Sequence, residues 1–122
     1  MATKKEQLTE VLRGIRAGSP EVFGAAVVSS EGFIIASVVP GDVDEDLVGG
    51  MAASLLGVGE RISADLMQAP MEQVFVRSPR GYIIINAIDA QASLVVLVSK
   101  EAKLGLIFLE LRRSIAELGA AL

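Results

Sequence analysis

Hydrophobic positions near both ends of the chain recur with the period of an α-helix. The first helix is expected to follow Thr3, which stands three residues before Glu6 at the spacing of a capping box. It should end at Gly18-Ser19-Pro20, because glycine and proline stop helices. The apolar face of this helix is made by Leu8, Val11, Leu12 and Ile15. The face of the last helix, which Gly119 is expected to close, is made by Leu104, Ile107, Phe108, Leu111, Ile115 and Leu118.

Five apolar runs of strand length lie between these helices. Short turns join most of them: 30–32 ends in glycine, 78–81 reads Ser-Pro-Arg-Gly with type I turn chemistry, and 89–91 joins the last two runs. The run from Val22 to Val28 is apolar on both of its sides, so both faces of the sheet should be covered. The predicted strands are 22–29, 33–39, 72–77, 82–88 and 92–99.

The middle of the chain predicts one long helix. Asp42 is the expected N-cap, and acidic residues at 44–46 suit the positive end of the helix dipole. The helix should run to about Gln68, with Pro70 ending it. The element order is then α-β-β-α-β-β-β-α. We therefore expect an α/β (α+β) fold in which residues 1–122 form one domain, a three-layer sandwich with a five-stranded antiparallel sheet and helices on both faces.

Two apolar stripes run side by side along the middle helix. The first is Leu47, Met51, Leu55, Val58, Ile62 and Leu66, and we expect it to pack on the sheet. The second is Val48, Ala52, Leu56 and Gly59, whose small members suit close helix contact. This second stripe is predicted to be a dimer or partner interface, although loops or ends of the same domain could cover it instead.

Two further features extend the predicted interface. Arg61 lies on the same helix and could reach toward the phosphates of a bound partner. The short run with Val74 and Val76 could be an edge strand that pairs with a second copy, and Arg77 or Glu72 could instead blunt that edge.

Composition removes several classes of function. The chain has no histidine and no cysteine, so the commonest general base, the commonest metal ligand and any thiolate are missing. It has no P-loop, and its Gly57-Val58-Gly59 lies inside a helix, where close packing explains it better than a dinucleotide. We expect no catalytic residue, no metal site and no cofactor. A net charge of −4, with one tyrosine and no tryptophan, argues against nucleic acid.

No apolar run approaches the roughly 18 residues that span a bilayer, and the N-terminus does not read as a signal peptide. We therefore expect no membrane insertion and a cytoplasmic location. Hydrophobic residues nevertheless make up 52% of the chain, which is high enough to leave apolar surface for partners.

Three segments together resemble the roadblock family, the dynein light-chain type. Val27–Ala36 is similar to the family's first hairpin, Asp44–Leu47 and Met51–Leu55 to its middle helix, and Leu104–Arg113 to its last helix. The resemblance covers nearly the whole chain and rests on the order and spacing of these segments. Because the chain lacks long terminal extensions, it resembles the stand-alone prokaryotic members.

The resemblance implies a homodimer or heterodimer in which third strands pair and middle helices lie side by side. It also implies that this helical layer docks a small Ras-like GTPase, whose hydrolysis some members accelerate. The first hypothesis is thus a non-catalytic homodimeric regulator or docking subunit for such a GTPase, at most a GTPase-activating protein. The alternatives are a dimeric scaffold or adaptor that leaves hydrolysis unchanged and a small-ligand sensor.

Overall fold

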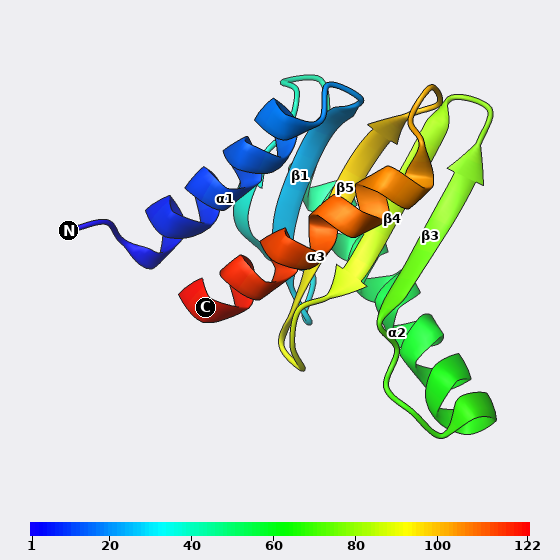
Figure 1. The fold of residues 1–122 in the computed structure, drawn as a ribbon. Helices are drawn as coiled ribbons and strands as arrows, with labels where there is room; N and C mark the ends of the chain where they lie inside the picture. The colour runs from blue at the N-terminus through cyan, green and yellow to red at the C-terminus, as the bar shows by residue number, and fades with distance from the viewer.

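The computed structural model describes residues 1–122 as three helices and five strands (Figure 1). Their order is the one that the hydrophobic pattern predicts, and strands 22–29 and 92–99 have the predicted bounds. The other boundaries of the strands differ by one residue. The elements are α1 Lys4–Gly18, β1 Val22–Ser29, β2 Ile34–Val38, α2 Glu45–Met67, β3 Gln73–Ser78, β4 Gly81–Ala87, β5 Ala92–Ser99 and α3 Leu104–Ala121.

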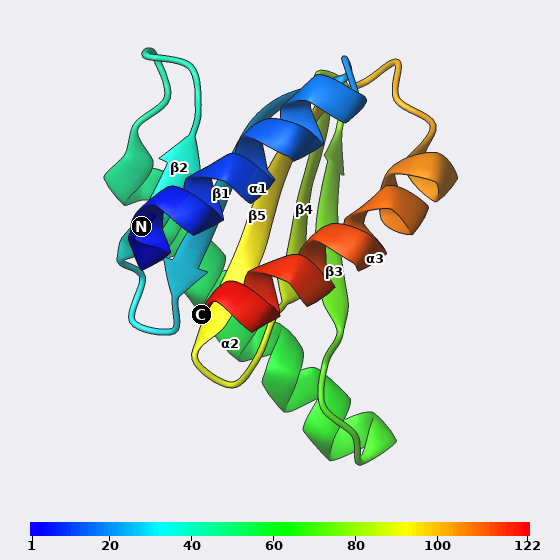
Figure 2. The same cartoon turned by 60° about the vertical axis from the view of Figure 1, so that its left-hand side comes forward.

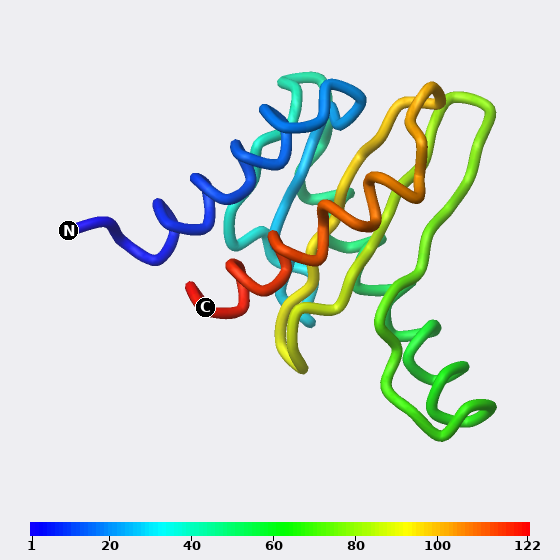
Figure 3. Tube along the Cα trace, viewed as in Figure 1, coloured from blue at the N-terminus to red at the C-terminus, as the bar shows by residue number.

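The sheet is antiparallel throughout, with strand order β2-β1-β5-β4-β3. Turns join β1 to β2, β3 to β4, and β4 to β5, and Figure 3 shows the chain returning from the end of α2 to enter the sheet as β3. Strands β2 and β3 form the two edges. The edge position predicted for the run with Val74 and Val76 is therefore confirmed.

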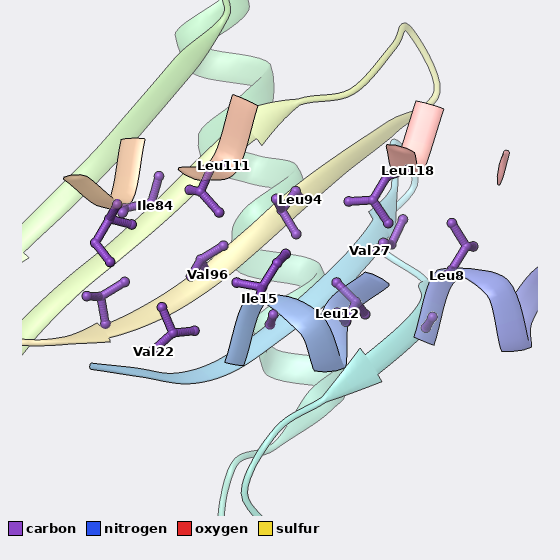
Figure 4. Close-up of a cluster of buried hydrophobic side chains, with 14 of the residues drawn as sticks. Leu8, Leu12, Ile15, Val22, Val27, Ile84, Leu94, Val96, Leu111 and Leu118 are labelled. Carbon is purple, nitrogen blue, oxygen red and sulfur yellow. The ribbon is translucent and has the colours of Figure 1, made fainter. Parts of the chain in front are cut away.

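Helices cover both faces of the sheet, as predicted. Helices α1 and α3 lie on one face and α2 on the other (Figures 1 and 2). The larger core, of 15 buried residues, lies between the sheet and the α1–α3 layer and includes Leu8 and Leu12 of α1 and Leu111 and Leu118 of α3 (Figure 4). Each such side chain stabilises the fold by about 1.5–3 kcal/mol when it leaves water completely.

The sequence predicted the start of α1 correctly but not the end of α3. The capping box at Thr3 is confirmed, because its Oγ1 accepts from the Glu6 N–H while the Glu6 carboxylate accepts from the Thr3 N–H. The prediction that Gly119 closes the last helix is wrong. The helix continues to Ala121, and the N–H of Leu122 donates to the carbonyl of Leu118.

The start of α2 also differs from the prediction. Asp44, not Asp42, is the N-cap: its Oδ1 accepts from the N–H of Leu47 at 3.1 Å. The chain is still turning before that point, since the N–H of Val43 donates to the carbonyl of Pro40 at 3.0 Å. The helix therefore begins only at Glu45, whose carboxylate accepts from a hydroxyl of β2.

Candidate docking surface

The two apolar stripes of α2 exchange the positions that the sequence predicted for them: the stripe predicted to be an interface faces the sheet, and the stripe predicted to pack on the sheet is exposed. Ala52 and Leu56, predicted to form an interface, are buried against the sheet at 3% and 7% exposure. Val48, predicted with them, is half-buried and packs against the same cluster. The smaller core between α2 and the sheet is made by Ala26, Val28, Ala52, Leu56, Met71, Ile85 and Val95.

Close approach explains why the small residues face inward. A Cβ built on Gly59 would lie 2.4 Å from the Met71 sulfur, so no side chain larger than hydrogen fits there without movement. The small residue at this position therefore lets α2 lie directly against the segment that leads into β3. Introducing a charge at Leu56 would therefore disrupt folding and could not probe docking.

The stripe predicted to pack on the sheet is instead the exposed one. We call Leu47, Met51, Val58, Ile62 and Leu66 the α2 stripe; these side chains are exposed by 58%, 64%, 57%, 55% and 75%. Leu55, in the same row, is half-buried against the smaller core. A continuous row of large aliphatic side chains on the surface is typical of a protein interaction site.

The flanks of α2 point to different edges of the sheet. Gly49 faces the β1–β2 hairpin, because a Cβ built on it would lie 2.2 Å from the carbonyl oxygen of Gly32. The α2 stripe lies on the other flank, since positions 47, 51 and 58 each precede a sheet-facing position by one residue. Leu55 of this flank and Val74 of β3 pack on the same cluster. The stripe therefore looks toward the β3 edge.

Strand β3 has only one neighbour in the sheet, β4. Val76 is 43% exposed on the same face as the half-buried Val74, the face that α2 covers. On the other face, Phe75 is 45% exposed and its ring meets that of Phe108 in α3 at a centroid distance of 5.8 Å. The outer edge of β3 is thus an unpaired backbone ladder beside apolar side chains.

The C-terminal half of α2 projects beyond the sheet (Figures 1 and 2). No residue from Gly57 to Pro70 is buried, and Arg61 in this segment is exposed. Arg61 makes no ion pair, because the chain's one ion pair joins Arg13 to Glu10. A shallow hollow on this part of the helix is lined by Val58, Arg61, Ile62, Asp65 and Leu66.

The structure thus places the sequence-predicted interface residues in three settings. Val48, Ala52, Leu56 and Gly59 pack within the chain, Val74 is half-buried, and Arg61 and Val76 are exposed. The surface that sequence reasoning missed is the α2 stripe.

No helix of the chain has the length and apolar character needed to cross a membrane.

Known proteins share both the sequence pattern and the fold. The pattern of the Roadblock/LC7 domain matches residues 8–98. An uncharacterized protein of Methanocaldococcus jannaschii is 36% identical over 98 residues, which are 80% of this chain and 84% of that protein. The gliding protein MglB of Thermus thermophilus superposes with a TM-score of 0.86 at 18% identity, covering 99% of this chain and 92% of MglB.

A second MglB structure, with a tetrameric arrangement, superposes with a TM-score of 0.89 at 19% identity, covering 99% of this chain and 91% of that one. At these identities the two structures establish a shared fold, α3 included, although α3 lies outside the matched sequence pattern. The match of the family pattern over residues 8–98 carries the assignment further: the chain belongs to the Roadblock/LC7 domain family.

Proposed function

We propose that this protein is a non-catalytic homodimer that docks and regulates a small Ras-like GTPase. The observation that carries the proposal is that the α2 stripe and the free edge of β3 lie on the same side of the molecule. Membership of the Roadblock/LC7 family and the MglB-like fold support it.

Pairing of two copies through β3 covers both exposed features together. Antiparallel pairing of two β3 edges satisfies the open backbone ladders and continues the sheet. It keeps both α2 helices on one face, with their apolar stripes turned toward each other. Burying a large aliphatic side chain completely stabilises by about 1.5–3 kcal/mol, so each stripe residue, between 55% and 75% exposed, contributes roughly 1 kcal/mol or more.

The GTPase would dock on the solvent-facing side of the paired helices. Gly50, Ser54 and Gly57 lie two residues from the sheet-facing positions, so they are on the opposite side of α2 and all three are exposed. No atom lies within 4 Å of a Cβ built on Gly50 or Gly57. From Gly50 to Gly57 this row carries no large side chain, which suits the close approach of another protein's backbone, and the exposed Arg61 follows one turn after Gly57.

Regulation would act on the residues of the GTPase itself. The chain holds no histidine or cysteine, and no group of three acidic residues is placed to hold a metal ion. A docked domain of this kind changes hydrolysis by fixing the position of the catalytic groups of its partner. A nucleotide-sensing regulator must bind the two nucleotide states with different affinities, because equal affinity shifts no equilibrium.

The proposal is tested by retaining partners from a lysate of the source cell. The immobilised protein is incubated with lysate loaded either with GDP or with a non-hydrolysable GTP analogue, and retained proteins are identified by mass spectrometry. We expect a Ras-like GTPase enriched only with the GTP analogue. Retention of the same GTPase equally in both states would favour a scaffold, and absence of any GTPase would refute the docking proposal.

A further inference from the structure

The two outer faces of the molecule carry opposite charge. Eight of the 11 lysines and arginines lie in residues 1–18 and 100–122, which contain α1 and α3, together with only five of the 15 acidic residues. Residues 42–72, which contain α2, hold seven acidic residues and a single basic one, Arg61. Because α1 and α3 cover one face of the sheet and α2 the other (Figures 1 and 2), a chain of net charge −4 has one basic face.

The cations of the α1–α3 face are available to a partner. All eight are exposed, and the one ion pair of the chain engages only Arg13. Glu110 is directed toward α1, where its carboxylate accepts a hydrogen bond from the hydroxyl of the buried Ser19. The first turn of α3 carries no acidic residue. The outward side of α3 is therefore basic along its first half.

Two exposed leucines lie between cations on this outward side. Leu106 and Leu109 are exposed by 58% and 63%. Leu109 is two residues from each of the buried Ile107 and Leu111, so it lies on the side of the helix that faces away from the sheet. Intervals of three, three and four residues place four side chains in one row along the helix: Lys103, Leu106, Leu109 and Arg113.

We infer that the α1–α3 face is a docking surface for an anionic lipid bilayer. A helix whose outward side combines aliphatic side chains with lysine and arginine is typical of helices that lie in the plane of a bilayer surface. The cations attract anionic headgroups, and Leu106 and Leu109 leave water at the boundary between headgroups and acyl chains. Helices α1 and α3 lie in one layer, so a flat bilayer contacts both of them (Figure 2).

The charge of the opposite face orients the bound molecule. Attraction at the α1–α3 face and repulsion at the acidic α2 face turn α2 away from the bilayer. The surface proposed for the GTPase then remains open to the solvent. This lipid contact is independent of the GTPase contact, because a single chain carries the complete row from Lys103 to Arg113.

Vesicle sedimentation with the purified full chain tests the lipid contact. The vesicles contain equal parts of phosphatidylserine and phosphatidylcholine, and vesicles of phosphatidylcholine alone are the neutral control. We expect the protein to sediment with the anionic vesicles and not with the neutral ones at low salt. Binding should fall steeply as salt is raised, because the Debye length shrinks to about 3 Å at 1 M.

Substitutions on the two faces locate the contact. Arg113→Gln should weaken binding to anionic vesicles about five-fold, and the double variant with Arg112→Gln about 25-fold, which is the effect of a cation close to an anionic surface. Arg61→Gln removes the same charge from the opposite face and should bind as wild type does. Leu109→Ser should weaken binding about five-fold without any change in charge. Circular dichroism of each variant verifies that the fold is retained.

The contrary results are distinct from failure of the proposed function, because these assays contain no GTPase. Failure to sediment with anionic vesicles at low salt, or equal sedimentation with neutral ones, would overturn the inference. Equal weakening by Arg61→Gln and Arg113→Gln would overturn the assignment of the face. Binding of fluorescent poly-glutamate without binding of anionic vesicles would assign the basic face to an acidic protein and overturn the lipid contact.

Discussion

Two neighbouring glycines of α2 should respond in opposite ways to the same substitution. Replacing glycine by alanine in a helix interior stabilises by about 0.5–1 kcal/mol, because alanine loses less backbone freedom on folding. Gly50→Ala should show this gain, since a Cβ at Gly50 meets no atom within 4 Å. Gly49→Ala instead places the Cβ 2.2 Å from the carbonyl oxygen of Gly32.

The hairpin cannot easily yield to that methyl group. Gly32 has a φ of +92°, which only glycine adopts readily, and the contacting atom is backbone. Overpacking of this kind costs about 1–3 kcal/mol. Subtracting the gain in helix propensity leaves Gly49→Ala less stable than wild type by about 1 kcal/mol, and less stable than Gly50→Ala by roughly 2 kcal/mol.

Urea denaturation followed by circular dichroism measures the difference. The three proteins are compared at one protein concentration, because dimerisation shifts apparent stability. With a slope of about 2 kcal/mol/M, the midpoints of the two variants should differ by roughly 1 M. Equal stabilisation of both variants would show that the β1–β2 hairpin does not rest on α2 and would refute the assignment of its two flanks.

Three other perturbations test the core, the first helix and the α2 stripe. Ser93→Ala should stabilise the folded protein by about 1 kcal/mol, because the buried Ser93 hydroxyl has no hydrogen-bond partner. Ser19→Ala removes a hydroxyl that donates to a carboxylate of α3, so it should lower the melting temperature in the same thermal melt. Hydrogen bonds from the backbone N–H and the hydroxyl of the N-cap residue hold the pKa of Glu6 below its ordinary value. The ionised Glu6 carboxylate therefore stabilises helix α1 at any pH above its ordinary pKa, and this stabilisation is lost as the pH falls through the lowered pKa. In Glu6→Gln, NMR of the first turn should no longer show this loss of structure in acid. Val58→Asp should weaken dimerisation by about 30-fold or more, given about 1–2 kcal/mol lost in each copy, while Leu109→Asp on the far face should leave sedimentation unchanged; equal effects of the two would contradict the surface assignment.

The fold followed from the sequence because its signals are local. Hydrophobic period separates helix from strand, and Pro20, Gly32 and Pro70 mark ends and turns within a few residues of where they occur. The run from Val22 to Val28, apolar on both sides, correctly indicated helices on both faces. The last helix ran past Gly119 because a glycine costs a helix about 1 kcal/mol and does not by itself end it.

The candidate site followed less well because it depends on tertiary distances. Both stripes of α2 are apolar. Hydrophobicity alone predicted that the stripe of larger side chains, from Leu47 to Leu66, would pack on the sheet. The structure turns Ala52 to the sheet and Gly59 to the side chain of Met71, whereas Met51 and Val58 are exposed. The small residues of the other stripe were the signal in the sequence that could have identified the sheet-facing side. They indicated close contact within the chain.

The docking claim is tested most directly on the exposed glycine row. Gly57→Arg adds a large side chain where a Cβ meets no atom within 4 Å, on the face of α2 opposite the sheet, so it should leave folding and dimerisation intact. Wild type and this variant are immobilised side by side and challenged with lysate loaded with the GTP analogue or with GDP. We expect wild type to retain a Ras-like GTPase only with the GTP analogue, and Gly57→Arg to fail to retain it. Equal retention by both proteins, or retention that ignores the nucleotide, would contradict it.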